Sequence, residues 1–174
     1  MAKLERWGIM GLLVALGISI GVLAGAWVYV GLLPAIALPV WVGVISWACF
    51  YAVGGKKEGL LKTLCSNLSG LLWGFLIVLV YSKFGGSLVV LAVAVAVGCF
   101  IMCIQANIKV LSFIPGAFAA TASYFSVVFY YGAAKITTRY DWLDTAICLI
   151  VGALLAYLSQ VIGNALSNIG KKAS

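Results

Sequence analysis

The chain has 174 residues, of which 65% are hydrophobic and only 9% are charged, and its mean hydropathy is +1.19. Soluble domains are about 45–50% apolar, so this composition excludes a soluble fold and indicates an all-α, polytopic membrane helical bundle. A chain of this length is too short for two membrane domains, and we expect residues 1–174 to form a single transmembrane domain.

The net charge of +7 does not predict nucleic-acid binding, because the basic residues are scattered at the ends of apolar segments and form no patch. The sequence has no histidine and no C-x-x-C motif, so we expect neither a metal site nor a cofactor. All five cysteines lie in apolar runs, which predicts small buried side chains. They are Cys49, Cys65, Cys99, Cys103 and Cys148.

The first apolar segment, Gly8 to Val30, is longer than the core of a secretory signal and predicts a retained transmembrane helix. Gly17, Gly21 and Gly25 recur every four residues, which places them on one helical face that another helix can approach closely. Trp27 and Tyr29, near the end of the segment, suit the aromatic belt of a membrane interface.

The second segment, Ala35 to Val53, follows Pro34 and contains Pro39, so its first turn is expected to be broken or to start late. The remaining 14 residues, Val40 to Val53, are few for a spanning helix. Interrupted segments of this kind are typical of transporter sites.

The third segment, Leu60 to Tyr81, is long enough to span a membrane but has a polar cluster in its first half. The cluster consists of Ser66, Asn67 and Ser69. Gly70 and Gly74 continue the helical face of Ser66, which predicts a close helix contact there. Polar side chains at this depth either join helices or line a pore, and the sequence leaves both readings open.

Three further segments complete the pattern. Ser87 to Ile108 is rich in valine, but an isolated strand cannot satisfy its backbone in lipid, so we expect a helix whose polar end at Gln105 acts as a cap. The fifth segment, Ala117 to Ala133, follows a second proline-opened turn at Ile114-Pro115-Gly116. The sixth, Asp141 to Leu166, opens with carboxylates that suit a helix N-terminus.

Six spans would place eight of the eleven basic residues on one side of the membrane. These are Lys3, Arg6, Lys56, Lys57, Lys62, Lys109, Lys171 and Lys172. The positive-inside rule then predicts that both ends of the chain are cytoplasmic.

The two halves of the chain share a weak pattern. Proline opens the second segment of each half, at Leu33-Pro34 and Ile114-Pro115, and Gly70 aligns with Gly152. The candidate halves are residues 1–85 and 86–174. Three spans per half would make the repeat inverted, a plan that recurs in channels and transporters.

The absence of several residue types and motifs argues against some classes of transporter, channel and enzyme for this chain. No ionisable side chain falls near the predicted centre of a span, which disfavours proton- or ion-coupled transport. The sequence also lacks the paired histidines of ammonia pores, a paired N-P-A motif and a T-V-G-Y-G filter. It has no nucleophile with a base and no phosphate-binding glycine loop, so we do not expect an enzyme.

Two stretches resemble the YcdZ-like family of small bacterial inner-membrane proteins, a family of unknown function. They are Ser66-Asn67-Leu68-Ser69-Gly70-Leu71-Leu72-Trp73-Gly74 and Phe113-Ile114-Pro115-Gly116-Ala117-Phe118. The resemblance implies a bacterial inner-membrane location and supplies no activity or ligand residues. The Asn-x-Ser-Gly cluster also faintly resembles urea-transporter half-repeats, which is an analogy only.

We therefore hypothesise a passive channel or facilitator for a small neutral or weakly polar solute, such as urea, a short amide or a short-chain metabolite. The side chains expected to line its path are Ser66, Asn67, Ser69, Trp73, Phe118, Thr121 and Ser123. Six short helices leave little room for a wide pore, so we expect a cyclic homo-oligomer in the bilayer, a trimer rather than a dimer. The glycines of the first segment are its candidate contact. The alternatives are a non-transporting scaffold or accessory subunit and, less favoured, a coupled transporter.

Overall fold

The computed structural model describes residues 2–131 and 141–172, which form helices joined by turns. The six α-helices are α1 (Ala2–Gly31), α2 (Val40–Ala52), α3 (Lys56–Lys83), α4 (Leu88–Ile104), α5 (Ile114–Phe125) and α6 (Asp141–Lys172). Two 3₁₀ turns, η1 (Gln105–Asn107) and η2 (Lys109–Leu111), follow α4, and a π-helical turn, η3 (Ser126–Tyr131), extends α5. These ranges contain no strand, so the expected all-α bundle is confirmed.

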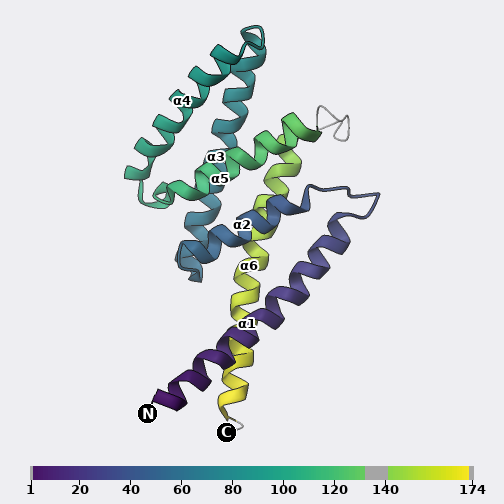
Figure 1. Cartoon of the computed structure of the whole chain (residues 1–174), viewed down its shortest axis with the longest axis vertical. Helices are drawn as coiled ribbons and strands as arrows, with labels where there is room; N and C mark the ends of the chain where they lie inside the picture. The colour runs from purple at the N-terminus through teal and green to yellow at the C-terminus, as the bar shows by residue number, and fades with distance from the viewer. Residues whose placement is uncertain (1, 132–140, 173–174) are drawn as a thin grey trace.

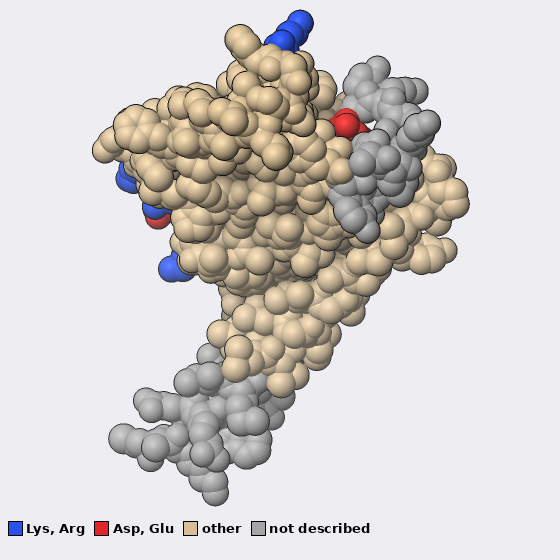
Figure 2. Space-filling view, turned by 45° about the horizontal axis from the view of Figure 1, so that its top comes forward, with Lys and Arg blue, Asp and Glu red and all other residues tan. Residues whose placement is uncertain are grey.

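The helices differ in whether they are long enough to cross a membrane. Four contain a stretch long and apolar enough to cross it: Gly11–Gly31, Lys56–Lys83, Leu88–Asn107 and Asp141–Asn168. Val40–Ala52 and Ile114–Phe129 are shorter apolar helices. Large apolar side chains are exposed on the outer faces, and Figure 2 shows a surface largely free of charge whose visible lysines and arginines lie at its edges. The protein is therefore a membrane protein with four long spans and two short helices.

The two short helices begin where their prolines predict. Pro39 is the N-cap of α2, so this helix starts late, at Val40, as expected from the sequence. Pro115 lies in the first turn of α5, where its missing N–H would be unpaired in any case. The valine-rich α4 is helical, and its first turn is capped by Ser87 Oγ, which accepts from the backbone N–H of Val90 at 3.3 Å.

The arrangement of the helices is that of two inverted halves. In Figure 1, α1 and α3 run upward whereas α4 and α6 run downward, and α2 and α5 cross the middle of the molecule in opposite directions. The start of α1 and the end of α6 lie at the same end of the molecule. The extensive contacts come in matching pairs: α3 packs on α5 as α6 packs on α2, and α1 packs on α6 as α4 packs on α3.

Two glycines make the matching crossings possible. A methyl group added to Gly70 of α3 would lie 2.6 Å from the carbonyl carbon of Ala117, and one added to Gly152 of α6 would lie 2.7 Å from that of Gly43. Backbones this close tolerate only glycine. The sequence alignment of Gly70 with Gly152 therefore joins equivalent positions, but its pairing of Pro34 with Pro115 does not. Pro34 lies in the connection before α2, and Pro39 is the proline that adjoins the helix.

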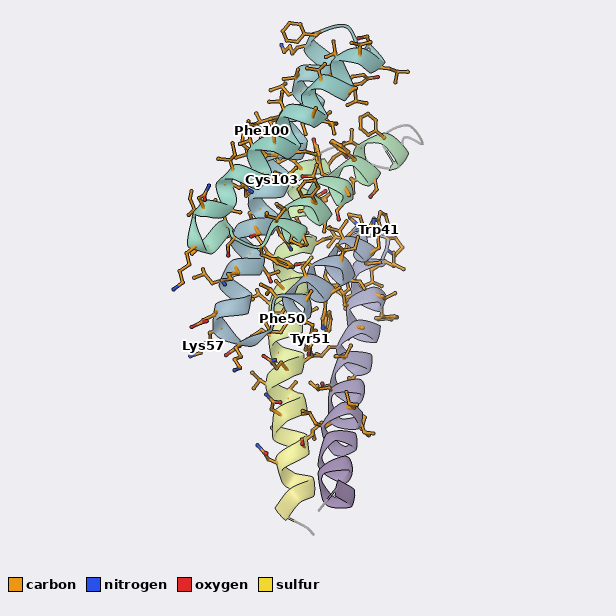
Figure 3. All side chains as sticks on the ribbon, turned by 60° about the vertical axis from the view of Figure 1, so that its left-hand side comes forward. Trp41, Phe50, Tyr51, Lys57, Phe100 and Cys103 are labelled. Atoms are coloured by element: carbon orange, nitrogen blue, oxygen red, sulfur yellow. The ribbon has the colours of Figure 1, made fainter. Side chains whose placement is uncertain are left out.

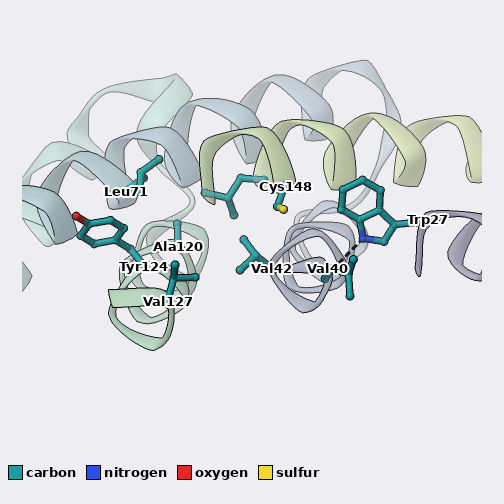
Figure 4. Packing of buried hydrophobic residues seen from close by; sticks show 9 residues of the cluster. Trp27, Val40, Val42, Leu71, Ala120, Tyr124, Val127 and Cys148 are labelled. Carbon is teal, nitrogen blue, oxygen red and sulfur yellow. Dashed lines mark hydrogen bonds between the residues drawn. The ribbon is translucent and has the colours of Figure 1, made fainter. Parts of the chain in front are cut away.

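Buried apolar side chains fill the space between the crossings. One cluster joins α1, α2, α3, α5 and α6 (Figure 4) and consists of Trp27, Val40, Val42, Leu71, Ala120, Tyr124, Val127, Cys148 and Leu149. Trp27 is only 7% exposed, and its indole N–H donates to the carbonyl of Val40 at 2.9 Å. Trp27 is therefore buried within the protein and bonded to the first turn of α2, so it does not belong to an exposed interfacial belt, whereas Tyr29 is 73% exposed.

The prediction for the cysteines holds only in part. Cys49 and Cys148 are buried, Cys65 and Cys99 are half-buried, and Cys103 is exposed. Figure 3 places Cys103 with Phe100 on α4, which packs on the rest of the protein mainly through one side against α3. An apolar run in a membrane helix does not imply burial within the protein, because lipid accepts the same side chains.

Candidate solute site

The centre of the site is a row of polar side chains on the buried face of α3. Thr63, Ser66 and Asn67 recur at helical spacing and are 0%, 0% and 1% exposed, and we call them the α3 polar stripe. Asn67 is the twelfth of the 28 residues of α3, so it lies about 16 Å along a helix of about 42 Å. The stripe thus lies in the first half of a helix long enough to span a membrane.

The carboxamide of Asn67 is held by a short relay to two other helices. Its Nδ2 donates to Ser46 Oγ of α2 at 2.9 Å, and Ser46 Oγ in turn donates to the carbonyl of Leu149 in α6 at 2.6 Å. Ser46 has a single hydroxyl proton, and Leu149 O can only accept it. Ser46 Oγ is therefore an acceptor toward Asn67, so the end of the carboxamide that faces Ser46 is the amide nitrogen Nδ2.

Each member of the stripe retains an unpaired polar atom. Asn67 Oδ1, Ser66 Oγ and Thr63 Oγ1 are buried and have no hydrogen-bond partner among the residues that the structure describes. Asn67 Oδ1 lies against the first turn of α5, where a methyl group on Gly116 would be 2.9 Å from it. Buried polar groups without a partner are rare and each costs about 1–3 kcal/mol, so three on one face require an explanation.

The other predicted path residues lie elsewhere. Thr121 Oγ1 donates to the carbonyl of Gly70 at 2.7 Å, across the α3–α5 crossing, and Ser123 Oγ donates to Ala119 O within its own helix. Phe118 is 37% exposed, on the outer side of α5. The structure brings Ser66 and Asn67 together but commits the hydroxyls of Thr121 and Ser123 to backbone carbonyls.

Ser69 and Trp73 form a separate polar contact with η1. Ser69 Oγ and the Trp73 indole N–H both donate to Gln105 Oε1, at 2.6 and 3.0 Å. Gln105 is the C-cap residue of α4, as expected, but its side chain crosses to α3 and does not cap its own helix. Its neighbour Asn107 does cap, because its Nδ2 donates to Ile104 O at 2.8 Å.

Sequence reasoning missed several buried polar residues. Ser46 and Thr63 were not singled out, although both share helices with residues that were. A second unpredicted contact joins α1, α2 and α6: Ser19 Oγ donates to Ser159 O, and the hydroxyls of Tyr51 and Ser159 are 2.8 Å apart. A serine or threonine within an apolar run was the available signal, but such residues are too frequent to identify a site by themselves.

The predicted helix-packing glycines fall into two groups. Gly70 and Gly74 lie against α5, at Ala117 and at Tyr124. Gly17, Gly21 and Gly25 are exposed, and a methyl group on any of them would meet nothing within 4 Å. Among residues 2–131 and 141–172, nothing packs against these three glycines.

Three surface grooves lie away from the stripe. One, of about 450 Å³, runs between α3 and α4 and is lined by apolar side chains that include Trp73, Ile77 and Val97. The other two adjoin the end of α1 and the contact of α3 with α6, and their linings are also apolar. None of the three includes a residue of the α3 polar stripe.

The fold defines a class: a polytopic α-helical membrane protein, here with uncharged polar groups on the buried face of α3. The chain belongs to the family described as protein of unknown function (DUF1097), whose model matches residues 17–164. No solved structure shows a significant match to the chain.

Named relatives place the family in bacteria. The chain is 28% identical over 173 residues to the uncharacterized protein YahC of Escherichia coli (strain K12), covering 92% of this chain and 96% of that protein. It is 33% identical over 123 residues to the inner membrane protein YcdZ of Salmonella typhimurium (strain LT2), covering 67% and 72%. YcdZ of Escherichia coli is 32% identical over 120 residues, covering 67% and 71%. The resemblance to the YcdZ-like family is confirmed.

Proposed function

We propose that this protein is a passive facilitator that lets a small neutral or weakly polar solute, such as urea or a short amide, cross a bacterial inner membrane, with no chemical step. The observation that carries the proposal is the α3 polar stripe, whose three buried side chains each leave a polar atom unpaired. A purely structural contact would be more stable with apolar side chains at these positions. A passing solute supplies the missing partners.

The position of the stripe supports this proposal. In membrane proteins built from inverted repeats, solute sites lie near the midplane where the repeats meet. Asn67 is near mid-length of α3, and its relay through Ser46 to Leu149 joins helices of both halves. The stripe therefore lies where that architecture places a solute.

The charges of the chain favour a neutral solute. The acidic side chains that the structure describes, Glu58, Asp141 and Asp144, lie in the first turns of α3 and α6. A cation at the stripe would have no carboxylate to neutralise it, which is costly in a medium of low polarity.

Location and topology complete the proposal. The YcdZ relatives are named inner membrane proteins, and we place this protein in the same membrane. The start of α1 and the end of α6 lie together (Figure 1), so both ends face one side, which the positive-inside rule makes the cytoplasm. Reporter fusions at each end, active only in the cytoplasm, test this assignment.

A homo-oligomer, with a trimer favoured, is part of the proposal. Gly17, Gly21 and Gly25 form an open face on α1 that a second copy can approach closely. Gly21→Leu is expected to reduce the oligomer measured by detergent-corrected light scattering, whereas Val22→Leu is not. An unchanged mass in Gly21→Leu would exclude this face as the contact.

The second candidate function is a scaffold or accessory subunit. The hydrogen bonds from Thr121 to Gly70 O and from Ser46 to Leu149 O favour a scaffold, because each joins a side chain of one helix to the backbone of another. A scaffold function does not explain why three buried polar atoms of the α3 polar stripe lack a partner among the described residues.

Reconstituted liposomes separate the two functions. The purified protein is reconstituted, and solute-driven swelling is followed by stopped-flow light scattering with a panel of urea, acetamide and glycerol. A facilitator increases the swelling rate over protein-free liposomes for at least one solute, and Asn67→Leu abolishes the increase while the protein stays folded. A rate equal to that of protein-free liposomes for every solute favours the scaffold.

A further inference from the structure

We infer that the α3 polar stripe selects solutes that donate hydrogen bonds through N–H groups, namely urea and primary amides, and rejects solutes of the same size that only accept. This inference rests on the proposed function and deepens it. It follows from which groups around Asn67 donate hydrogen bonds and which accept them.

The first step is the orientation of the Asn67 carboxamide. Ser46 Oγ gives its only proton to Leu149 O at 2.6 Å, so it can bind Asn67 only as an acceptor. The group it accepts from at 2.9 Å is Nδ2. The free end of Asn67, which is 1% exposed and lacks a partner, is therefore the carbonyl oxygen Oδ1, which accepts and cannot donate.

The second step is the wall that faces Oδ1. The first turn of α5 passes close to it at Gly116, but the N–H of Gly116 donates to Phe113 O at 3.1 Å. Pro115, one residue earlier, has no N–H to offer. Pro115 and Gly116, at the start of α5, thus bring the backbone close to Asn67 without giving its carbonyl oxygen a donor.

The third step adds the other two members of the stripe. Ser66 and Thr63 are fully buried on the same face of α3, and their oxygens have no partner among the described residues. Neither hydroxyl donates to a carbonyl of the described residues, so each can give its proton to a solute or accept one from it. The stripe thus joins an obligate acceptor, Asn67 Oδ1, to two hydroxyls that can donate or accept. A molecule with N–H donors beside a carbonyl satisfies all three, whereas a solute that only accepts leaves Asn67 Oδ1 without a donor.

The test compares molecules that differ mainly in their donors. Acetamide and acetone have nearly the same size and shape, but only acetamide carries N–H groups. Flux of labelled urea into proteoliposomes is measured with an excess of each, which avoids the fast passage of acetone through lipid. We expect acetamide to reduce the protein-dependent urea flux severalfold and acetone to leave it unchanged.

Variants of the stripe give a second readout. Thr63→Val and Ser66→Ala each remove a hydroxyl that has no partner among the described residues, so both variants should fold. Each is expected to raise the half-saturating urea concentration about threefold, the effect of one hydrogen bond within a membrane. Ser82→Ala is the matched control, because Ser82 is exposed and bonds only Val78 O at 2.9 Å.

The failures of the inference and of the proposed function are distinguishable. Equal inhibition by acetamide and acetone, or protein-dependent flux of glycerol without flux of urea, would overturn the donor selectivity and leave a facilitator in place. Absence of protein-dependent flux for urea, acetamide and glycerol alike would overturn both.

Discussion

The unpaired hydroxyl of Thr63 gives the sharpest test of the site, because a bonded threonine lies nearby for comparison. Both side chains are buried, at 0% exposure for Thr63 and 7% for Thr121. Thr121 Oγ1 donates to Gly70 O at 2.7 Å, whereas Thr63 Oγ1 has no partner among the described residues. Valine has nearly the same shape as threonine, so Thr→Val removes the hydroxyl with little change in packing.

The expected free energies of unfolding differ in sign. Thr121→Val loses one interhelical hydrogen bond, worth about 0.6 kcal/mol on average in membrane proteins and up to about 1.7 kcal/mol, and leaves Gly70 O without this donor. Thr63→Val removes a buried group whose lack of a partner costs about 1–3 kcal/mol, so the variant should be as stable as the wild type or more stable. A difference of about 2 kcal/mol between the two variants is expected.

The measurement is reversible unfolding in mixed micelles as the fraction of sodium dodecyl sulfate is raised, followed by far-UV circular dichroism. Wild type, Thr63→Val and Thr121→Val are compared at one protein concentration. If Thr63→Val lost as much stability as Thr121→Val, the Thr63 hydroxyl would have a partner in the folded protein. The proposed site would then lose one of its three unpaired polar groups and most of its rationale.

Two further predictions test the helix contacts. Gly70→Ala and Gly152→Ala should each destabilise the protein by about 1–3 kcal/mol, because the added methyl group meets a backbone that cannot move aside. In the same unfolding assay Gly17→Ala should be neutral, since its methyl group meets nothing within 4 Å, and a similar loss there would contradict the assignment. Gln105→Leu should release the indole N–H of Trp73 and so change the tryptophan fluorescence spectrum. The same substitution made in a Trp73→Phe protein should leave the spectrum unchanged. Identical spectra for the wild type and Gln105→Leu would argue against the contact.

Much of the fold follows from the sequence, because a membrane restricts the available structures. Apolar runs of spanning length must be helices in lipid, since no other isolated segment satisfies its own backbone. Prolines therefore mark the starts of α2 and α5, and the polar connection after Val53 marks a turn. The spacing of Gly70 and Gly74 also indicates a close crossing, because only glycine lets two backbones approach so closely.

The sequence could not assign partners to the polar side chains. Ser66, Asn67 and Ser69 lie within one helical turn, yet Ser69 turns to Gln105 while the other two face the inside of the protein. Gly17, Gly21 and Gly25 have the same spacing as Gly70 and Gly74, but no described residue packs against them. Local spacing defines a face of a helix and leaves open which neighbour, if any, covers it.

By itself, the sequence determined that this is an all-helical membrane protein with polar groups at the depth of Asn67, because hydrocarbon allows few alternatives for so apolar a chain. The tertiary structure alone decided that Ser46 takes the donor end of the Asn67 amide and that Pro115 and Gly116 leave its carbonyl without one. Hydrogen bonds between residues 21 and 103 positions apart depend on how helices cross, and no local pattern encodes that crossing.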